Sequence, residues 1–125
     1  MPFGDAQRPL YETKANLFKG LAHPYRIRVL EILSSAGETS VADLLSDTGL
    51  EASHLSQHLA VLRRYRLVRS ERRASAVYYR LAFPEVAELL RVARRLLLGI
   101  LTDDQAHGAA AAALPALTPR GEHEE

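Results

Sequence analysis

The sequence has no cysteine and no long apolar segment. Without cysteine, the chain cannot form disulfides, thiolate metal sites or a thiol nucleophile. Its one strongly apolar run, at residues 96–101, is far shorter than the roughly 20 residues that cross a bilayer. The N-terminus also lacks the pattern of a secretory signal peptide. We therefore expect a cytoplasmic protein that has no membrane partner.

The chain also lacks a strong net charge, because its formal charge at pH 7 is only +1. The charges are nevertheless unevenly distributed. Residues 63–80 contain seven arginines and one acid, whereas residues 103–125 contain five acids and one base. A local cluster of arginines is the kind of surface that meets nucleic-acid phosphates. The sequence therefore predicts a basic patch and a separate acidic tail.

The 125 residues are enough for one domain. We expect a flexible arm at residues 1–8, a folded domain at 9–106 and a disordered tail at 107–125 that is rich in alanine and then acidic. Helical spacing of apolar residues, with proline near helix starts and glycine after helix ends, predicts five helices. They are residues 9–22, 24–36, 41–48, 52–65 and a long helix from Pro84 onward.

Two details of the helices are predicted from their residues. Ser40 and Asp43 resemble a capping box at the start of the third helix, with Asp in place of the usual Glu. The second helix is expected to have a wide buried face. Its members are Ile27, Val29, Leu30, Ile32 and Leu33.

After the fourth helix the apolar spacing becomes strand-like. Residues 67–73 and 76–81 carry β-branched and aromatic side chains around a short turn at Ala74 and Ser75, which favours a hairpin. The two preceding helices are joined by a tight turn at Gly49. This order predicts a mainly α (α+β) winged helix-turn-helix with a two-stranded β-hairpin wing.

The helix at residues 52–65 is the candidate recognition helix. Leu55, Leu59 and Leu62 have the spacing of a buried face, so the opposite face is polar near its N-terminus and basic near its C-terminus. Slim polar side chains let a helix enter the major groove, and a glutamine there can bond adenine. The predicted DNA contacts are Ser53, His54, Ser56, Gln57, Arg63 and Arg64. An ordinary solvated helix face is the alternative, and the neighbouring elements favour DNA.

The hairpin supplies Arg69, Arg72 and Arg73, and Arg66 lies at its entry. We expect these arginines to bind phosphates and fix the register of the protein on DNA. A charged strand edge that guards against aggregation is the alternative.

The last helix has an apolar face that is too broad for one small domain to cover. A symmetric partner would cover it, with help from the first helix, and a buried helix in a monomer is the alternative. The predicted homodimer interface consists of Leu10, Leu17, Val86, Leu89, Leu90, Ala93, Leu96, Leu97 and Ile100. Two recognition helices would then lie about 34–36 Å apart and bind a palindrome.

Three stretches of the chain carry recognisable motifs: residues 21–30 (LAHPYRIRVL), residues 53–59 (SHLSQHL) and residues 77–81 (VYYRL). In that order, they resemble the second helix, the recognition helix and the wing of the ArsR/SmtB family of winged-helix repressors. The resemblance extends over about residues 17–101. It implies a homodimeric transcriptional repressor that binds operator DNA and, in many members, releases it when a metal binds.

The positions of the family's metal ligands carry other residues in this chain. The cysteine positions hold Ser40 and Ala42, and the positions of a second site hold Phe83, Glu85, Leu96 and Gly99. Only Glu85 among them is a metal-ligand type. We therefore expect no metal cofactor at the sites that the resemblance implies.

Two alternatives remain for the input signal. Asp103, Asp104 and His107 could form a non-standard nickel or zinc site near the C-terminus. Alternatively, the signal comes from a separate sensor or co-repressor protein. Of the other histidines, His23 is expected to be structural, and His58 to pack beside the core or touch a phosphate. Catalysis is not expected, because no nucleophile elbow, phosphate loop or catalytic cluster is present.

Overall fold

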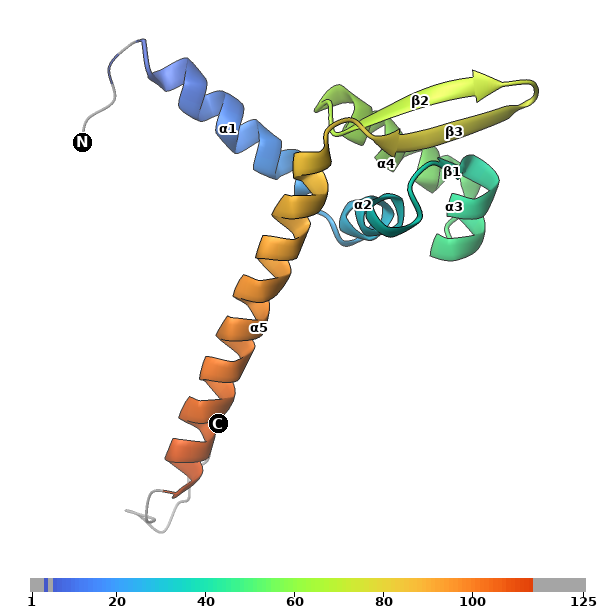
Figure 1. Cartoon of the computed structure of the whole chain (residues 1–125). Helices are drawn as coiled ribbons and strands as arrows, with labels where there is room; N and C mark the ends of the chain where they lie inside the picture. The colour runs from blue at the N-terminus through green and yellow to red at the C-terminus, as the bar shows by residue number, and fades with distance from the viewer. Residues whose placement is uncertain (1–3, 5, 114–125) are drawn as a thin grey trace. The chain divides into compact units, whose positions relative to one another are not determined.

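The computed structural model describes residue 4 and residues 6–113, with side chains described as far as residue 108 (Figure 1). Its elements are α1 (Arg8–Leu21), α2 (Pro24–Ala36), β1 (Thr39–Ser40), α3 (Val41–Thr48), α4 (Ala52–Arg64), β2 (Val68–Arg73), β3 (Ala76–Leu81) and α5 (Pro84–Ala113). The five helices and the hairpin predicted from the sequence are therefore confirmed, and their shared boundaries agree to within one residue. The chain divides into two compact units, Met1–Glu88 and Leu89–Glu125.

The ends of the helices in the first unit are fixed by specific hydrogen bonds. The His23 Nδ1 atom accepts a hydrogen bond of 3.1 Å from the Tyr25 backbone N–H at the start of α2, which confirms the structural role expected for this histidine. Ser40 Oγ accepts from the Asp43 backbone N–H at 3.1 Å and so caps α3 as predicted. The Arg26 guanidinium donates to the Gly20 and Lys19 carbonyl oxygens, at 2.7 and 3.2 Å, at the end of α1. These bonds cap α2 and α3 and join α2 to the end of α1.

The core of the first unit is made by apolar side chains from α2, α3, α4, both hairpin strands and the start of α5. The buried apolar residues are Val29, Leu30, Ile32, Leu33, Leu44, Leu55, Leu59, Leu62, Leu67, Val68, Tyr79 and Val86. Ile27 is a correction, because the sequence placed it on the buried face of α2 but its side chain is 37% exposed. It has helical spacing from Leu30, yet it lies near the start of α2, and the buried residues of this helix begin only at Val29.

The sheet has three strands in the order β1-β3-β2, all antiparallel (Figure 1). The sequence predicted only the hairpin. The third strand, β1, was missed because it consists of two residues, which are too few to show an alternating pattern. Thr39 pairs with Tyr79 and Ser40 with Tyr78, so β1 joins the start of α3 to the middle of the hairpin.

The hairpin turn contains Ala74 and Ser75, and Arg73 pairs with Ala76 across it. Ala74 has φ +55°, in the left-handed region that glycine adopts most readily. The Asn-Gly or Asp-Gly signal that marks such turns in a sequence is therefore absent although the turn forms.

Two boundaries differ from those expected. Arg8 belongs to α1 rather than to the N-terminal arm, and α5 runs to Ala113, past the expected boundary at residue 106. The rest of the predicted tail, residues 114–125, lies outside the described residues, as do residues 1–3 and 5 of the predicted arm. Within the described part of the chain, no helix has the length and apolar character that a membrane span requires.

Candidate nucleic-acid interface

The outward face of α4 carries the polar residues that the sequence assigned to DNA. Leu55, Leu59 and Leu62 are 1%, 3% and 0% exposed, so the helix turns its apolar side fully inward. The six predicted contacts of this helix are all exposed on the remaining surface: Ser53, His54, Ser56, Gln57, Arg63 and Arg64. This helix therefore presents short polar side chains at its start and two guanidinium groups at its end.

The strand register assigns the hairpin arginines to two opposite faces. Successive side chains of a strand point to opposite sides of the sheet. Ser70 pairs with the buried Tyr79 and Arg72 with Val77, so Ser70 and Arg72 share the face that the core residue Val68 occupies. Arg69 and Arg73 project from the other face. The hairpin arginines were predicted as one set, although alternation along the strand already separates Arg72 from Arg69 and Arg73.

Arg72 lies at a groove that it shares with the recognition helix. Ser56 and Arg63 of α4 line this groove, opposite Ser70 and Arg72 of β2, and its volume is about 350 Å³. A polar hydroxyl and two guanidinium groups from separate elements therefore border the same hollow. The geometry brings together three of the predicted contacts, Ser56, Arg63 and Arg72.

Arg73, in contrast, already has partners within the chain. Its Nη2 atom bonds Glu38 Oε1, and its guanidinium lies 4.1 Å from the centre of the Tyr78 ring. The hydrogen bond to Glu38, and next the negative charges of Glu38 and Glu71, raise the pKa of Arg73. Glu38 was missed by the sequence analysis because it precedes Arg73 by 35 positions. No local pattern could pair them.

Arg69 lies over the ring of Phe83, with 5.5 Å from its guanidinium carbon to the ring centre. Arg66, the phosphate contact expected at the entry to the hairpin, has a φ of +62°. Its backbone N–H donates to Arg63 O, and the Leu67 N–H donates to Leu62 O, both at 2.9 Å. This hydrogen-bond pair is a Schellman motif, in which glycine is the usual residue.

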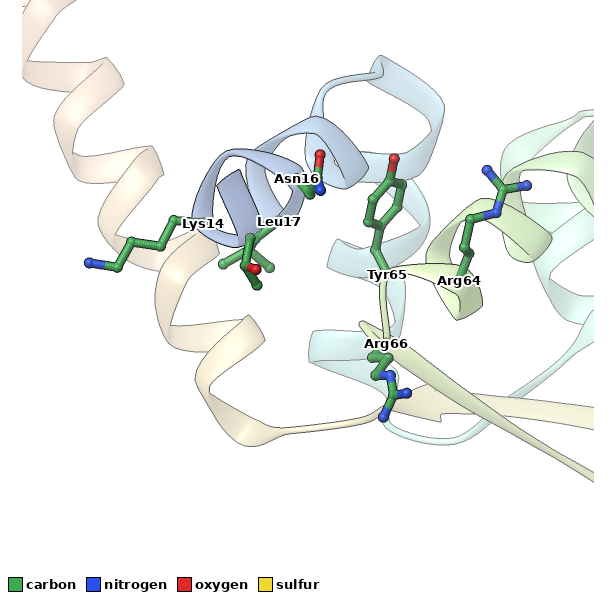
Figure 2. Close-up of a pocket in the computed structure, with 7 residues that line it drawn as sticks. Lys14, Asn16, Leu17, Arg64, Tyr65 and Arg66 are labelled. Carbon is green, nitrogen blue, oxygen red and sulfur yellow. The ribbon is translucent and has the colours of Figure 1, made fainter. Parts of the chain in front are cut away.

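A second hollow lies between α1 and the end of α4 (Figure 2). Leu17 and Tyr65 supply apolar surface there, whereas Lys14, Arg64 and Arg66 point in different directions and do not converge on one point. A methyl group on Gly20 would approach the Tyr65 ring to 2.8 Å, so glycine permits this close contact of α1 with the end of α4. Arg64 is thus separate from the groove that contains Arg72.

The predicted dimer residues have three different surroundings within one chain. Leu10, Leu96, Leu97 and Ile100 are 65%, 64%, 54% and 49% exposed, and Ala93 is exposed as well. Leu17, Leu89 and Leu90 are half-buried. Val86 is a correction: it is 6% exposed and belongs to the core of the first unit. It has the spacing of the apolar stripe, but it lies in the first turn of α5, which its own domain covers.

Two of the candidate metal ligands near the C-terminus lie close to each other. His107 Nδ1 lies 3.6 Å from Asp103 Oδ2, one helical turn away, and both side chains are largely exposed. Among the residues with described side chains, no three His, Asp or Glu side chains gather as a ligand set. This pair would need further ligands from elsewhere to hold a metal ion.

His58 is the one histidine of α4 that packs against another element. Its ring centre lies 4.3 Å from that of His23 and 6.0 Å from that of Tyr25, which confirms the packing role. Burial lowers the pKa of His58, and the positive charges of His23, Arg26 and His54 lower it further. The neutral imidazole is therefore favoured at the junction between α2 and the recognition helix.

Comparisons with known proteins agree with this geometry. Residues 23–70 match the model of the family described as bacterial regulatory protein, arsR family. The HTH-type transcriptional regulator Rv0081 of Mycobacterium tuberculosis is 53% identical over 96 residues, which cover 76% of this chain and 83% of that protein. Its crystal structure superimposes with a TM-score of 0.72, at 52% identity, over 77% of this chain and 96% of that one.

Two further relatives carry names with opposite directions of regulation. A biofilm growth-associated repressor of Agrobacterium fabrum is 35% identical over 72% of this chain and 80% of its own length. The transcriptional activator HlyU of Vibrio cholerae is 40% identical over 64% of this chain and 73% of its own length.

A solution structure from Mycobacterium bovis, Mb0332, is described as a homodimeric winged helix-turn-helix DNA-binding domain. It has a TM-score of 0.65 to this chain at 27% identity, covering 85% of this chain and 93% of that one. The winged helix-turn-helix predicted from the sequence is confirmed, and the family excludes an enzymatic role. With its groove-forming α4 and hairpin and its extensive similarity to Rv0081, this chain belongs to the ArsR family of bacterial transcriptional regulators.

Proposed function

We propose that two copies of this chain bind a palindromic operator in the bacterial cytoplasm and repress transcription from it. The observation that carries the proposal is the shared groove of Ser56, Arg63 and Arg72, which sets a basic strand beside the exposed face of α4. A helix in the major groove with a basic wing beside it is the geometry by which winged helices hold DNA.

The two classes of contact have different roles in this proposal. Gln57 is exposed at the leading half of α4, where side chains reach base edges. Arg63 and Arg72 have the chemistry of phosphate contacts, which set affinity and register but carry no sequence information. The affinity for any duplex then depends on the arginines, and the choice among duplexes depends on the first turns of α4.

The exposed apolar residues in the outer part of α5 indicate that a second copy is needed. Leu96, Leu97 and Ile100 are about half exposed or more in one chain. An exposed apolar patch of this kind is typical of an interaction surface. A twofold partner covers such a face with an identical one. The half-sites of the operator would then be about one helical turn apart.

The experiment is selection of bound genomic fragments, followed by affinity measurements on the selected operator. Gln57→Ala should relax base preference at one position of each half-site, by about 1–3 kcal/mol. Arg72→Gln should weaken binding to all sequences alike and lower the salt dependence by about one unit of slope per copy, or about two for the dimer. Identical effects of the two substitutions on specificity would contradict the assigned roles, and failure to enrich any fragment would contradict DNA recognition.

We also propose that the chain regulates without a metal cofactor. Support comes from the residue types at the family's ligand positions and from the exposed, two-member contact of His107 with Asp103. Nickel or zinc at stoichiometric concentration should change operator affinity less than about tenfold. A larger loss, abolished by His107→Gln, would identify the non-standard metal site instead.

A separate sensor or co-repressor protein is the remaining source of input. Such a protein should be retained with the operator-bound dimer. Adding it in purified form should also change the operator affinity of the dimer.

A further inference from the structure

A small hollow lies at the base of the hairpin, and Arg72 is not among its lining residues. It has a volume of about 260 Å³ and combines three arginines with an apolar floor. Its lining residues are Arg63, Arg66, Val68, Arg69, Ala82 and Phe83. All six belong to the first compact unit.

The three guanidinium groups at this hollow have no carboxylate partner within residue 4 and residues 6–108. The ion pairs found there involve Arg8, Arg73 and His107 instead. Arg69 lies over the Phe83 ring, and Phe83 remains 48% exposed. Three neighbouring like charges repel one another, and an anion bound among them would relieve the repulsion.

Arg66 occupies its position at a conformational cost. Its φ of +62° is the left-handed conformation of a helix C-terminus, where glycine fits without strain. Strained residues that persist in a structure often have a functional reason. The hydrogen bonds of the motif are made by the backbone alone, so the fold itself has no need for the arginine side chain.

Arg63 belongs to two hollows. It lines this one and also the groove that contains Ser56 and Arg72. The Arg63 guanidinium cannot bind a DNA phosphate in the groove and another anion in the hollow at the same time. The two sites are therefore coupled through a single side chain.

We propose that Arg63, Arg66 and Arg69 form a binding site for a small phosphate-bearing anion, and that its occupation weakens DNA binding by drawing Arg63 away from the groove. The coupling to DNA rests on the proposed function, whereas anion binding itself does not. The volume is below the roughly 300–1,000 Å³ of pockets for drug-sized ligands, which fits inorganic phosphate or a small phosphorylated molecule. Guanidinium groups bind phosphate in a bidentate manner, and Phe83 offers a flat apolar surface beside them.

The test uses sodium phosphate against sodium chloride at equal ionic strength, on the full chain and its Arg66→Gly variant. Arg66→Gly removes one guanidinium and relieves the left-handed strain, so the variant should fold at least as well as the parent. Isothermal titration should detect phosphate binding to the parent and at least tenfold weaker binding to Arg66→Gly. Equal binding to both proteins, or to neither, would overturn the site.

The coupling is measured as operator affinity in the same two salts. Phosphate should weaken the parent's operator binding on the order of fivefold or more relative to chloride, and should leave Arg66→Gly nearly unaffected. Arg72→Gln is the matched control, because it removes an arginine from the groove alone and should keep the response to phosphate. The same response in the parent and Arg66→Gly would show a general salt effect and overturn the coupling.

Two further outcomes distinguish a free-anion site from a DNA-phosphate contact, and failure of the anion site from failure of the proposed function. A large loss of operator affinity for Arg66→Gly in chloride would mean that the hollow holds a DNA phosphate, and the free-anion proposal would be wrong. If the parent binds no operator in either salt, the proposed function fails, and the titration with phosphate still decides whether the anion site exists.

Discussion

The apolar faces of α4 and α5 consist of similar residues in opposite surroundings. On α4, Leu59 and Leu62 are at most 3% exposed, because the same chain covers them. On the outer part of α5, Leu96 and Leu97 are 64% and 54% exposed. Apolar faces of similar composition therefore have two different roles. The face of α4 anchors a recognition helix within one chain, and the face of α5 needs cover from another copy.

The largest expected effect is the loss of the dimer. Leu96→Glu places a charge in the apolar face of α5, so the two half-sites of the operator must be bound independently. Because linked binding gains about 10²–10⁴ over a single site, operator affinity should fall by a factor in that range, measured by fluorescence anisotropy.

Thr102→Glu is the matched control for this substitution. Thr102 is exposed on the opposite side of α5 by helical geometry, and the change adds the same charge. Equal losses for Leu96→Glu and Thr102→Glu would mean that charge rather than the apolar face is responsible.

The next effect concerns stability and sharpens the contrast between the helices. Leu59→Ala leaves a cavity in the core, so the free energy of unfolding should fall by about 2–5 kcal/mol at every protein concentration. Leu97→Ala removes contacts between the two copies, so the fall in the free energy of unfolding should depend on protein concentration. Urea unfolding at two concentrations checks this. A concentration-independent loss for Leu97→Ala would assign that residue to a core within one chain.

A smaller effect compares the two faces of the hairpin. Glu38 holds Arg73 on the face away from the groove, so Glu38→Gln should release this arginine and raise DNA affinity up to about fivefold at low salt. Glu71→Gln removes a carboxylate from the same face without breaking that bond, and it controls for general charge. An equal rise for both, or a fall for Glu38→Gln, would show that Glu38 does not compete with DNA for Arg73.

The smallest effect is a pH dependence of stability. The pKa of His58 is lowered in the folded protein, so the unfolded chain binds more protons in acid. This contribution is fully present above the ordinary value of about 6.5 and is lost as the pH falls through the lower folded value. His58→Gln should flatten the unfolding free energy between about pH 7 and 5 relative to the parent, while His107→Gln on α5 serves as the control. An unchanged slope for His58→Gln would contradict the assignment.

The elements of the first unit could be predicted because their signals are local. Pro24, Gly37 and Gly49 mark helix ends, and the leucines of α4 alone identify its buried face. The residues of that helix that do not share the leucine face are then predicted to be exposed. These signals sit within one or two turns of the chain, which is the range over which spacing and capping act.

The errors of sequence analysis share one cause, which is contact between distant positions. Val86 and Ile27 have the right spacing for the faces assigned to them, but burial at the first turn of a helix depends on what lies over it. The opposed directions of Arg72 and Arg73 follow from strand alternation, whereas the cross-strand partners of the two residues depend on the register. The pairing of Arg73 with Glu38 and the three-arginine hollow depend on the folded chain, and no spacing rule encodes them.

Footprinting of the selected operator at single-nucleotide resolution tests the central claim most directly, namely that α4 reads DNA while α5 joins two copies. We predict two protected patches on one face of the duplex, with centres about 10–10.5 base pairs apart and two chains per duplex. A single protected patch occupied by one chain would contradict it.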